Sequence, residues 1–475
     1  MKTFIKSLTA LVVALTTFVS CQDFADMDNT SKASSDEIIS MDSLNPSEQS
    51  ASNNYWKTLE PINWGELKSL NARFEFFNLL ESQVKEMSTL ELSQLVATYP
   101  LNCLVLAYND PLIAIKLICE NSNIHKELVK REDAASTLVN HFICHDCSAK
   151  EFLPITEYDF IDELFLEHFF LSGLIDISSE KELMLTAVSN KKALYQADPS
   201  MNSSLTLSQL DRLEEYLHIP DNSLSFNSRS ESTIYTPTFQ SLIGLVFSEL
   251  TQYQINYTNT CAQLCFPNAV FISNSSRKYN CHSYAWYNTS QYNTIWLNAT
   301  DSISQQFQLS KYWTPNCVYS SCNKENAEKV YYSVFDHSAI VLGPDTVISK
   351  WGQGPLMKHT YEDCPYDTTN LQFFKFDPGT CVRTPFNNIT GSTQFSVNTQ
   401  RTFQISKSFP GMSVNWTVQY ISNPANTSSY SYTTDINNNL YLTCYVVGAY
   451  KLRADFIFNG VAVSFSDMTV VATPF

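Results

Sequence analysis

The chain has 475 residues, of which 44% are hydrophobic and 16% charged, so we expect several globular domains and not a disordered chain. Its 30 Lys and Arg against 47 Asp and Glu give a net charge of −17, and no basic cluster stands out, which argues against a nucleic-acid partner. The sequence has no G-x-G-x-x-G or Walker loop, so it gives no support for nucleotide chemistry.

The N-terminal segment, residues 1–21, has the pattern of an export signal. Lys2 and Lys6 form a short basic start, and residues 8–19 are an apolar run of 12 residues. A membrane-spanning helix needs about 20 apolar residues, so this run is too short to be an anchor helix. We therefore expect a secretory signal peptide.

The signal ends in Phe18-Val19-Ser20-Cys21, which resembles the lipobox of bacterial lipoproteins. The resemblance implies cleavage before Cys21 and lipidation of that cysteine. The acidic stretch at 22–28 resembles the surface-export signal of Bacteroidetes-type lipoproteins, which implies an exported protein anchored at the outer membrane, at the cell surface. The alternative is ordinary cleavage after a small residue, which leaves a soluble secreted protein.

Two segments follow the signal. Residues 22–55 are rich in Ser, Asn, Asp and Glu and are predicted to form a flexible tether. Residues 56–220 are predicted to form an all-helical domain, because apolar side chains recur at steps of three and four from Leu67 to Met87 as one stripe. The stretch 87–142 resembles an all-helical domain of bacterial surface lipoproteins and carries no evident catalytic group, so we interpret it as a spacer or docking module.

Several short motifs predict where helices of this domain begin. Three are capping boxes, and one is an N-cap residue followed by proline at the first helical position. They are Ser88 with Glu91, Ser179 with Glu182, Thr206 with Gln209, and Asp110-Pro111.

The cysteines leave several possibilities open. The chain has 13, and 12 remain if Cys21 is lipidated. Cys144-His145-Asp146-Cys147, with His141 one turn earlier, offers metal donors, but no second ligand pair stands out elsewhere. We expect no metal site there, and the alternatives are a disulfide or free thiols. The sequence does not determine which cysteines would form a disulfide.

The character of the chain changes after the helical domain. Residues 221–236 are Ser-rich and polar, which predicts a linker. Residues 237–382 mix short helices with strands, and residues 385–475 alternate apolar and polar side chains between turn signals. About seven short strands in this last segment, including 413–420 and 441–447, predict an immunoglobulin-like β-sandwich.

The candidate chemistry lies in residues 237–382. Cys281 precedes a plausible helix, where the helix dipole and an imidazolium can stabilise a thiolate nucleophile. His337 opens a predicted strand and is the candidate base, with its ring expected within about 4 Å of the Cys281 sulfur. If the next strand pairs Leu342 with Thr346, Ser349 lies diagonal to His337 and can orient it, whereas a one-residue slip would present Lys350.

The motifs that carry these residues resemble a known family. A cysteine on a helix, then a histidine that starts a strand, then a polar residue on the next strand is an order that resembles the papain-like superfamily in its CHAP- and NlpC-type amidase branch. More specifically, the motifs N-C-H-S-Y-A-W (280–286), D-H-S-A-I-V (336–341) and S-K-W-G-x-G-P-L-M-x-H (349–359) resemble a set of secreted bacterial amidase-like domains. The resemblance covers roughly 279–366 and implies a papain-like α+β hydrolase domain. In the Ser349-Lys350-Trp351-Gly352 segment, Ser349 stands where papain-like proteases carry Asn, so this chain departs from the family at its third residue.

Four other residues in or near these motifs are also considered for a role in the site. His359 follows a Gly-rich loop and is a substrate contact or an alternative third residue to Ser349. Asn280 is a candidate oxyanion donor beside the backbone amide of Cys281, and Trp351 is a candidate cleft wall. His282 diverges from Cys281 by about 100° on a helix and is interpreted as structural.

The sequence thus predicts a multidomain α+β surface lipoprotein that cleaves a peptide or a peptidoglycan-type amide by a Cys-His mechanism. The partners expected are that substrate and a membrane reached through Cys21, with no nucleic acid and no cofactor. A non-catalytic surface binding or adhesion protein is the alternative from another class. An acyltransferase is a third possibility, because hydrolysis and transfer share one acyl-enzyme.

Overall fold

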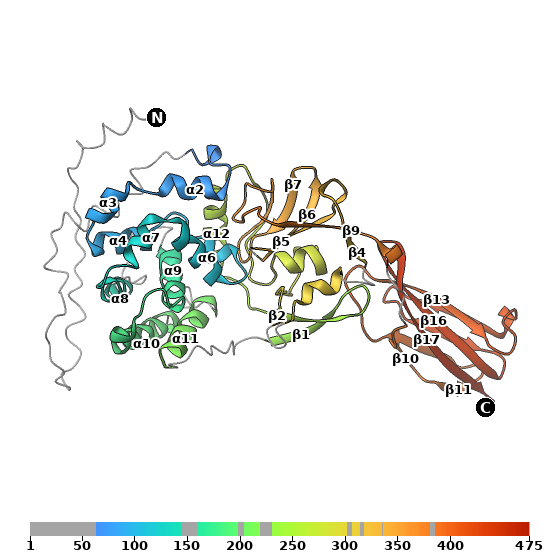
Figure 1. The fold of residues 1–475 in the computed structure, drawn as a ribbon. Coiled ribbons are helices and arrows are strands. Elements are labelled where there is room, and N and C mark those ends of the chain that lie inside the picture. Colours follow the sequence, from blue (N-terminus) through green and yellow to red (C-terminus); the bar gives the residue numbers. More distant parts are fainter. Residues whose placement is uncertain are drawn as a thin grey trace, which may run out of the picture.

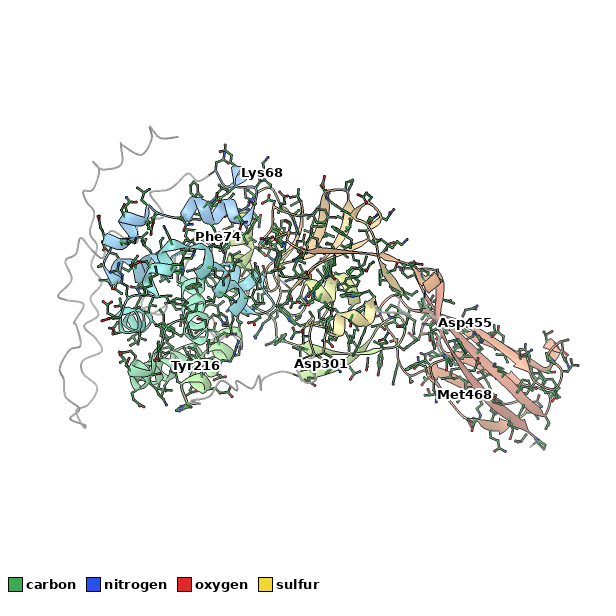
Figure 2. All side chains as sticks on the ribbon, viewed as in Figure 1. Lys68, Phe74, Tyr216, Asp301, Asp455 and Met468 are labelled. Carbon is green, nitrogen blue, oxygen red and sulfur yellow. The ribbon has the colours of Figure 1, made fainter. Side chains whose placement is uncertain are left out.

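The computed structural model describes residues 63–144, 159–197, 204–218, 230–301, 306–313, 318–334, 336–380 and 385–474. There the protein is a multidomain α+β structure with three parts in a row (Figure 1): a helical domain, a middle domain around a seven-stranded sheet, and a pair of four-stranded sheets. Figure 2 shows the described side chains in the same view, with Phe74 and Tyr216 in the helical domain, Asp301 in the middle domain and Asp455 in the last part.

The helical domain buries the apolar faces of its helices in one core, as the periodicity of residues 56–220 predicts. Its helices are α2 (Leu70–Phe77), α3 (Glu81–Glu86), α4 (Thr89–Ala97), α5 (Leu104–Ala107), α6 (Pro111–Asn121), α7 (Asn123–Leu128), α8 (Ala134–Cys144), α9 (Asp159–Leu171), α10 (Lys181–Ala197) and α11 (Ser204–His218).

Two of the four predicted helix starts form as expected. Ser88 and Glu91 make a reciprocal capping box at α4, and Asp110 caps α6 with Pro111 at the first helical position. The prediction at Thr206 is wrong, because α11 begins earlier, at Ser204. Ser179 lies in a 3-10 turn, Ser178–Glu180, directly before α10.

The apolar stripe from Leu67 to Met87 belongs to two helices and not to one. α2 ends at Phe77, and Asn78 then bonds to the turn between α6 and α7: its Nδ2 donates to the Asn121 carbonyl at 2.9 Å, and its Oδ1 accepts from the Asn123 amide at 2.8 Å. These tertiary bonds compete with continuation of the helix. Leu80 is accordingly 57% exposed at the start of α3.

The middle domain is an antiparallel sheet in the order β3-β8-β7-β6-β5-β9-β4, preceded by a hairpin and a helix. One part of the predicted linker is wrong, since residues 230–235 form the first strand of that hairpin. The elements are β1 (Ser230–Tyr235), β2 (Ser241–Val246), α12 (Gln252–Cys265), β3 (Val270–Ser273), β4 (Tyr319–Ser321), β5 (Lys329–Tyr332), β6 (His337–Gly343), β7 (Thr346–Lys350), β8 (Leu356–His359) and β9 (Leu371–Phe376).

The helical domain and the middle domain share one continuous core. Buried side chains of the middle domain, among them Phe266, Trp351 and Tyr366, belong to the same apolar cluster as the helical residues. Arg73 of α2 extends across this boundary: its guanidinium bonds to Asp363 at 2.6 Å and to the Cys265 carbonyl at 2.8 Å. Because a large apolar interface disfavours domain motion, the two domains form one packed unit.

The C-terminal part consists of two four-stranded sheets over a shared core that contains Trp416, Leu442 and Leu452. The predicted strand at 413–420 is confirmed with the same bounds, whereas the one at 441–447 runs from Leu440 to Cys444. The strands are β10 (Ile389–Thr390), β11 (Gln394–Ser396), β12 (Gln400–Ile405), β13 (Ser413–Tyr420), β14 (Tyr430–Thr434), β15 (Leu440–Cys444), β16 (Gly448–Phe458) and β17 (Val461–Thr473).

Several sequence predictions concern residues outside the described ranges. They are the signal peptide and Cys21, the tether at 22–55, the first part of the linker, and His145 to Cys147 of the metal-donor cluster. In the ranges that the structure describes, no helix has the length and apolar character needed to cross a membrane.

We expect the Arg73–Asp363 ion pair to be important for the stability of the packed unit. Both side chains are buried, at 0% and 6% exposure, so Asp363→Ala leaves an uncompensated guanidinium in the core. The free energy of unfolding should fall by about 3–5 kcal/mol, measured by denaturant titration with circular dichroism. Glu81→Ala, at an ion pair whose side chains are 80% and 60% exposed, is the control and should leave the transition in place. Equal shifts in both variants would contradict this account.

Candidate active site

Cys281 lies in the first turn of a short helix that packs on the seven-stranded sheet. Asn280 caps this helix, since its side-chain oxygen accepts a hydrogen bond from the Ser283 amide at 3.1 Å. The helix continues as the π-helix η6 (Ser283–Tyr287), and Trp286 donates to the Ser338 hydroxyl of β6 at 2.9 Å. Cys281 therefore stands at a helix N-terminus, where amides lack intrahelical partners, as the sequence predicts.

His337 begins β6, also as predicted, and its ring is fully buried. The ring stacks on Tyr366 with centroids 3.5 Å apart and meets the Tyr332 ring edge-on at 5.1 Å. Among the residues that the structure describes, neither ring nitrogen has a hydrogen-bond partner. Burial, with the charges of His359 and His282, holds the pKa of His337 well below its ordinary value, so the imidazole is neutral at physiological pH.

The Cys281 thiol contacts an asparagine of the helical domain and does not hydrogen-bond to His337. Asn109 Nδ2 lies 3.5 Å from the Cys281 sulfur and donates to the Asp336 carbonyl at 2.8 Å. The other end of this amide, Oδ1, accepts from Asn280 Nδ2 at 2.9 Å. Sequence reasoning missed Asn109, because nothing local to it signals that it meets a cysteine 172 positions later in the chain.

A second imidazole, that of His282, is held in an ion pair beside the thiol. Its Nε2 lies 3.1 Å from Asp336 Oδ1 and its Nδ1 lies 2.8 Å from the Ser338 hydroxyl. Burial alone would lower the pKa of His282, but the charges of Cys281 and Asp336 outweigh it and raise the pKa to about 10. Asp336 was also missed, although it directly precedes His337 in the D-H-S motif.

Ser349 lies in the predicted register but bonds to a different histidine. The pairs Ile340–Ile348 and Val341–Val347 are those expected, and the turn differs only in pairing Gly343 with Thr346. Ser349 Oγ lies 2.7 Å from His359 Nε2, and His359 Nδ1 lies 2.6 Å from the Thr360 carbonyl. Because Nδ1 must carry the proton to donate to a carbonyl, the Ser349 hydroxyl donates to Nε2.

This arrangement corrects the expected role of Ser349. Since the structure gives no bond from either group to His337, Ser349 and His359 form a separate buried pair on β7 and β8. Burial lowers the pKa of His359 to about 4, so this imidazole is also neutral. Lys350, the residue that a slipped register would have presented, donates to the carbonyls of Ser276, Gly352 and Gly354 instead.

The other two candidates are also held within the protein. The Asn280 amide nitrogen donates to Asn109 Oδ1 and to the Leu297 carbonyl, each at 2.9 Å. Asn280 therefore positions Asn109, and it has no N–H left to donate to an oxyanion. Trp351 is 2% exposed and packs on the Phe266 and His359 rings, so it belongs to the core beside the candidate site.

The helical domain covers the site. The segment that precedes α6 accepts two hydrogen bonds from the middle domain. The Gln353 amide donates to the Leu106 carbonyl, and the Tyr366 hydroxyl donates to the Ala107 carbonyl. Gly352 adopts φ +51, and a Cβ there would lie 2.6 Å from both carbonyls, so only glycine permits this approach. Cys281 itself is 1% exposed, beneath the Asn109 side chain that the same segment carries.

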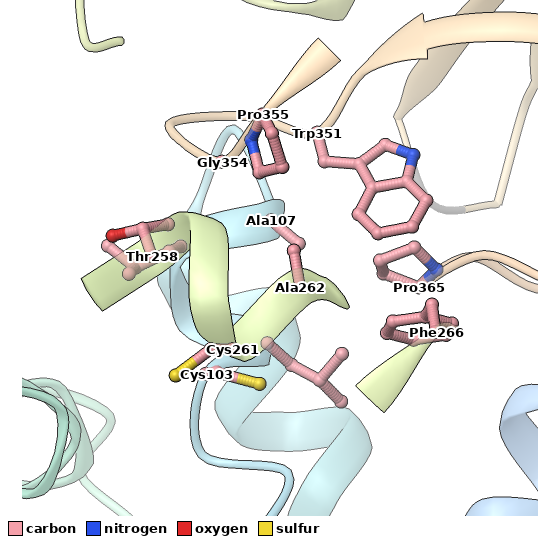
Figure 3. Close-up of a pocket in the computed structure, with 12 residues that line it drawn as sticks. Cys103, Ala107, Thr258, Cys261, Ala262, Phe266, Trp351, Gly354, Pro355 and Pro365 are labelled. Carbon is pink, nitrogen blue, oxygen red and sulfur yellow. The ribbon is translucent and has the colours of Figure 1, made fainter. Parts of the chain in front are cut away.

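A small pocket also lies between the two domains, but it does not reach Cys281 or His337. Mostly apolar side chains line it, including Phe266, Trp351 and Pro355 (Figure 3). Nowhere in the described ranges do three or more His, Cys, Asp or Glu side chains gather in a way that could hold a metal ion. Comparison with protein families and with curated proteins finds no match to this chain.

The His282–Asp336 pair predicts a measurable charge. At about pH 7, His282 should be an imidazolium, with ¹⁵N shifts that titrate only near pH 10, and Asp336→Asn should lower its pKa because a stabilising anion is lost. Because the pKa of His282 is higher in the folded protein than its ordinary value of 6.5, protonation of His282 stabilises the fold. This stabilisation is fully present below pH 6.5 and is lost as the pH rises toward about 10. His359 is the internal control and should stay neutral in both proteins. A neutral His282 at pH 7 would contradict the assignment.

Proposed function

We propose that the protein is a cysteine amidase or peptidase of the papain-like class, with Cys281 as nucleophile and His337 as base. The observation that carries the proposal is the pairing of two features in one fold. A capped helix presents Cys281 at its N-terminus against an antiparallel sheet, and the strand on which it packs begins with His337. His337 is buried and neutral, and neither of its ring nitrogens has a hydrogen-bond partner within the described ranges, whereas most buried polar groups of proteins have one.

In the proposed reaction, a neutral His337 takes the proton of the Cys281 thiol, and the sulfur attacks the carbonyl carbon of the substrate amide. The C–N bond then breaks, the amine leaves with the proton from His337, and a thioester remains on Cys281. Water then attacks this ester, gives a proton to His337, and releases the acid while the thiol is restored. No cofactor takes part in any step.

Two neighbouring groups can support this chemistry electrostatically. The imidazolium of His282, held by Asp336, is a positive charge next to the sulfur and favours its thiolate. The Asn109 Nδ2 that faces the sulfur, together with the first amides of the helix, offers donors where a carbonyl oxyanion would develop. For Cys281 to reach His337, the thiol must first leave Asn109.

The remaining assignments follow from the sequence and belong to the same proposal. The export signal and Cys21 point to a surface lipoprotein of the bacterial outer membrane, and an amide in peptide or peptidoglycan is the substrate class. The pair of four-stranded sheets serves as an immunoglobulin-like spacer or accessory domain, and the helical domain packs on the catalytic domain as its cover.

The full chain should release new amino groups from peptide or peptidoglycan stem substrates, detected by mass spectrometry. Cys281→Ala and His337→Ala should each reduce the rate by roughly 1,000-fold or more, because they act in one mechanism. Cys322→Ser, at a partly exposed cysteine, is the matched control and should keep full activity. If all four proteins cleave nothing, or the two variants match the wild type, hydrolysis is excluded.

The burial of the site favours one alternative. Cys281 is 1% exposed beneath Asn109, as expected of a packing residue in a surface binding protein whose middle domain has lost catalysis. An acyltransferase would instead form the thioester and pass the acyl group to an added amine. The same assay separates the three functions, since only a hydrolase yields the free acid and only a transferase yields the amine adduct.

A further inference from the structure

Two cysteines meet where the helical domain joins the middle domain. Cys103 directly precedes α5 of the helical domain, and Cys265 is the last residue of α12. Their sulfur atoms are 3.9 Å apart although the residues are separated by 162 positions in the chain. Both thiols also lie 3.9 Å from the same acceptor, the Pro100 carbonyl.

The local structure leaves room for these sulfurs to bond. A disulfide needs an S–S distance of about 2.05 Å, so each sulfur must move by about 1 Å, within the range of a side-chain rotation. The pocket between the domains is lined by Cys103 and by Ala262 of α12, and it provides space beside the Cys103 side chain (Figure 3). Cys261, one turn before Cys265, lines the same pocket and is the competing partner for Cys103.

We propose that Cys103 and Cys265 are a disulfide site that joins the helical domain covalently to the middle domain. The thiolate of one cysteine attacks a small disulfide oxidant, forms a mixed disulfide and displaces one thiol. The second cysteine then attacks the mixed disulfide and displaces the other. The protein thus loses two hydrogens, and the oxidant is reduced to two thiols. Because Cys265 is buried, the bond forms before the domains dock or during transient opening.

The bond has a structural consequence for the cover over Cys281. Cys103 lies six residues before Asn109, in the same short connection that precedes α6. Oxidation therefore fixes the segment that holds Asn109 over the Cys281 thiol. The disulfide site itself does not depend on the proposed amidase function, because both cysteines lie outside the Cys281–His337 pair.

The test uses the full chain refolded in a glutathione redox buffer, with free thiols blocked and peptides mapped without reduction. Chymotryptic cleavage after Leu264 separates Cys261 from Cys265, so the two pairings give different cross-linked peptides. We expect the Cys103–Cys265 peptide, its loss in Cys103→Ser and Cys265→Ser, and its retention in Cys261→Ser and Cys119→Ser. The oxidised wild type should melt roughly 5 °C or more above the reduced form.

Two results would overturn the proposal. One is that Cys103 and Cys265 both remain free in a redox buffer that oxidises other cysteines of the chain. The other is a Cys103–Cys261 cross-link in the wild type, which would assign the bond to the neighbouring turn of α12. Circular dichroism of each serine variant shows whether it has folded, and Cys265→Ala replaces Cys265→Ser if the hydroxyl is not tolerated at this buried position.

Discussion

The continuous apolar core between the helical domain and the seven-stranded sheet is the constraint on which the candidate site depends. At this core Arg73 of α2 donates to the carbonyl of Cys265 at the end of α12 and pairs with Asp363 across the boundary. The same packing brings the connection before α6 onto the loop at Gly352 and over the Cys281 helix. A smaller or more polar interface would leave Cys281 open to solvent. The helical domain therefore determines how far Cys281 is exposed, although Asn109, the residue that covers the thiol, does not stand out in the sequence.

Inside this cover, three buried histidines occur in two protonation states. His337 and His359 are neutral because burial disfavours a charge, and for His359 this effect outweighs the carbonyl of Thr360 and the charge of Asp363, which raise its pKa. His282 is equally buried, but Asp336 and Cys281 stabilise its imidazolium. A neutral imidazole is the form that accepts a proton, and a fixed imidazolium favours a thiolate. The environment thus holds a neutral imidazole at the start of β6 and a fixed positive charge beside the Cys281 sulfur, and perturbed pKa values of this kind are typical of functional sites.

The sequence predicted the parts of the fold that depend on local patterns. The strand at 413–420, the cap at Ser88, the helix start at Cys281 and the register of β6 with β7 all follow from periodicity and turn chemistry. It failed where distant segments compete with a local pattern. Asn78 ends α2 by bonding to the turn between α6 and α7. At residues 230–235 the reason is local: the polar composition predicted a linker, but the next strand, β2, pairs with these residues in a hairpin.

The candidate site was also predicted only in part, because local patterns do not show which distant side chains come into contact. Cys281 and His337 lie at element ends that their own motifs specify. Their neighbours depend on tertiary contacts: Asn109 comes from another domain, and Ser349 bonds to His359 because β8 lies on the far side of β7. A diagonal position on a neighbouring strand shows that the Ser349 hydroxyl could contact His337. It does not show which of two nearby imidazoles forms the hydrogen bond.

The most direct test of the account is the alkylation rate of Cys281 at about pH 6, measured by peptide mapping after a brief pulse of a small reagent. Because Asn109→Ala uncovers the Cys281 sulfur, the reagent should label Cys281 of this variant before any other cysteine. The account also predicts that adding His337→Ala slows this labelling, because the base that deprotonates the thiol is then absent. Equal rates with and without His337, or no labelling of Cys281 once Asn109 is removed, would contradict the claim that these two residues act together.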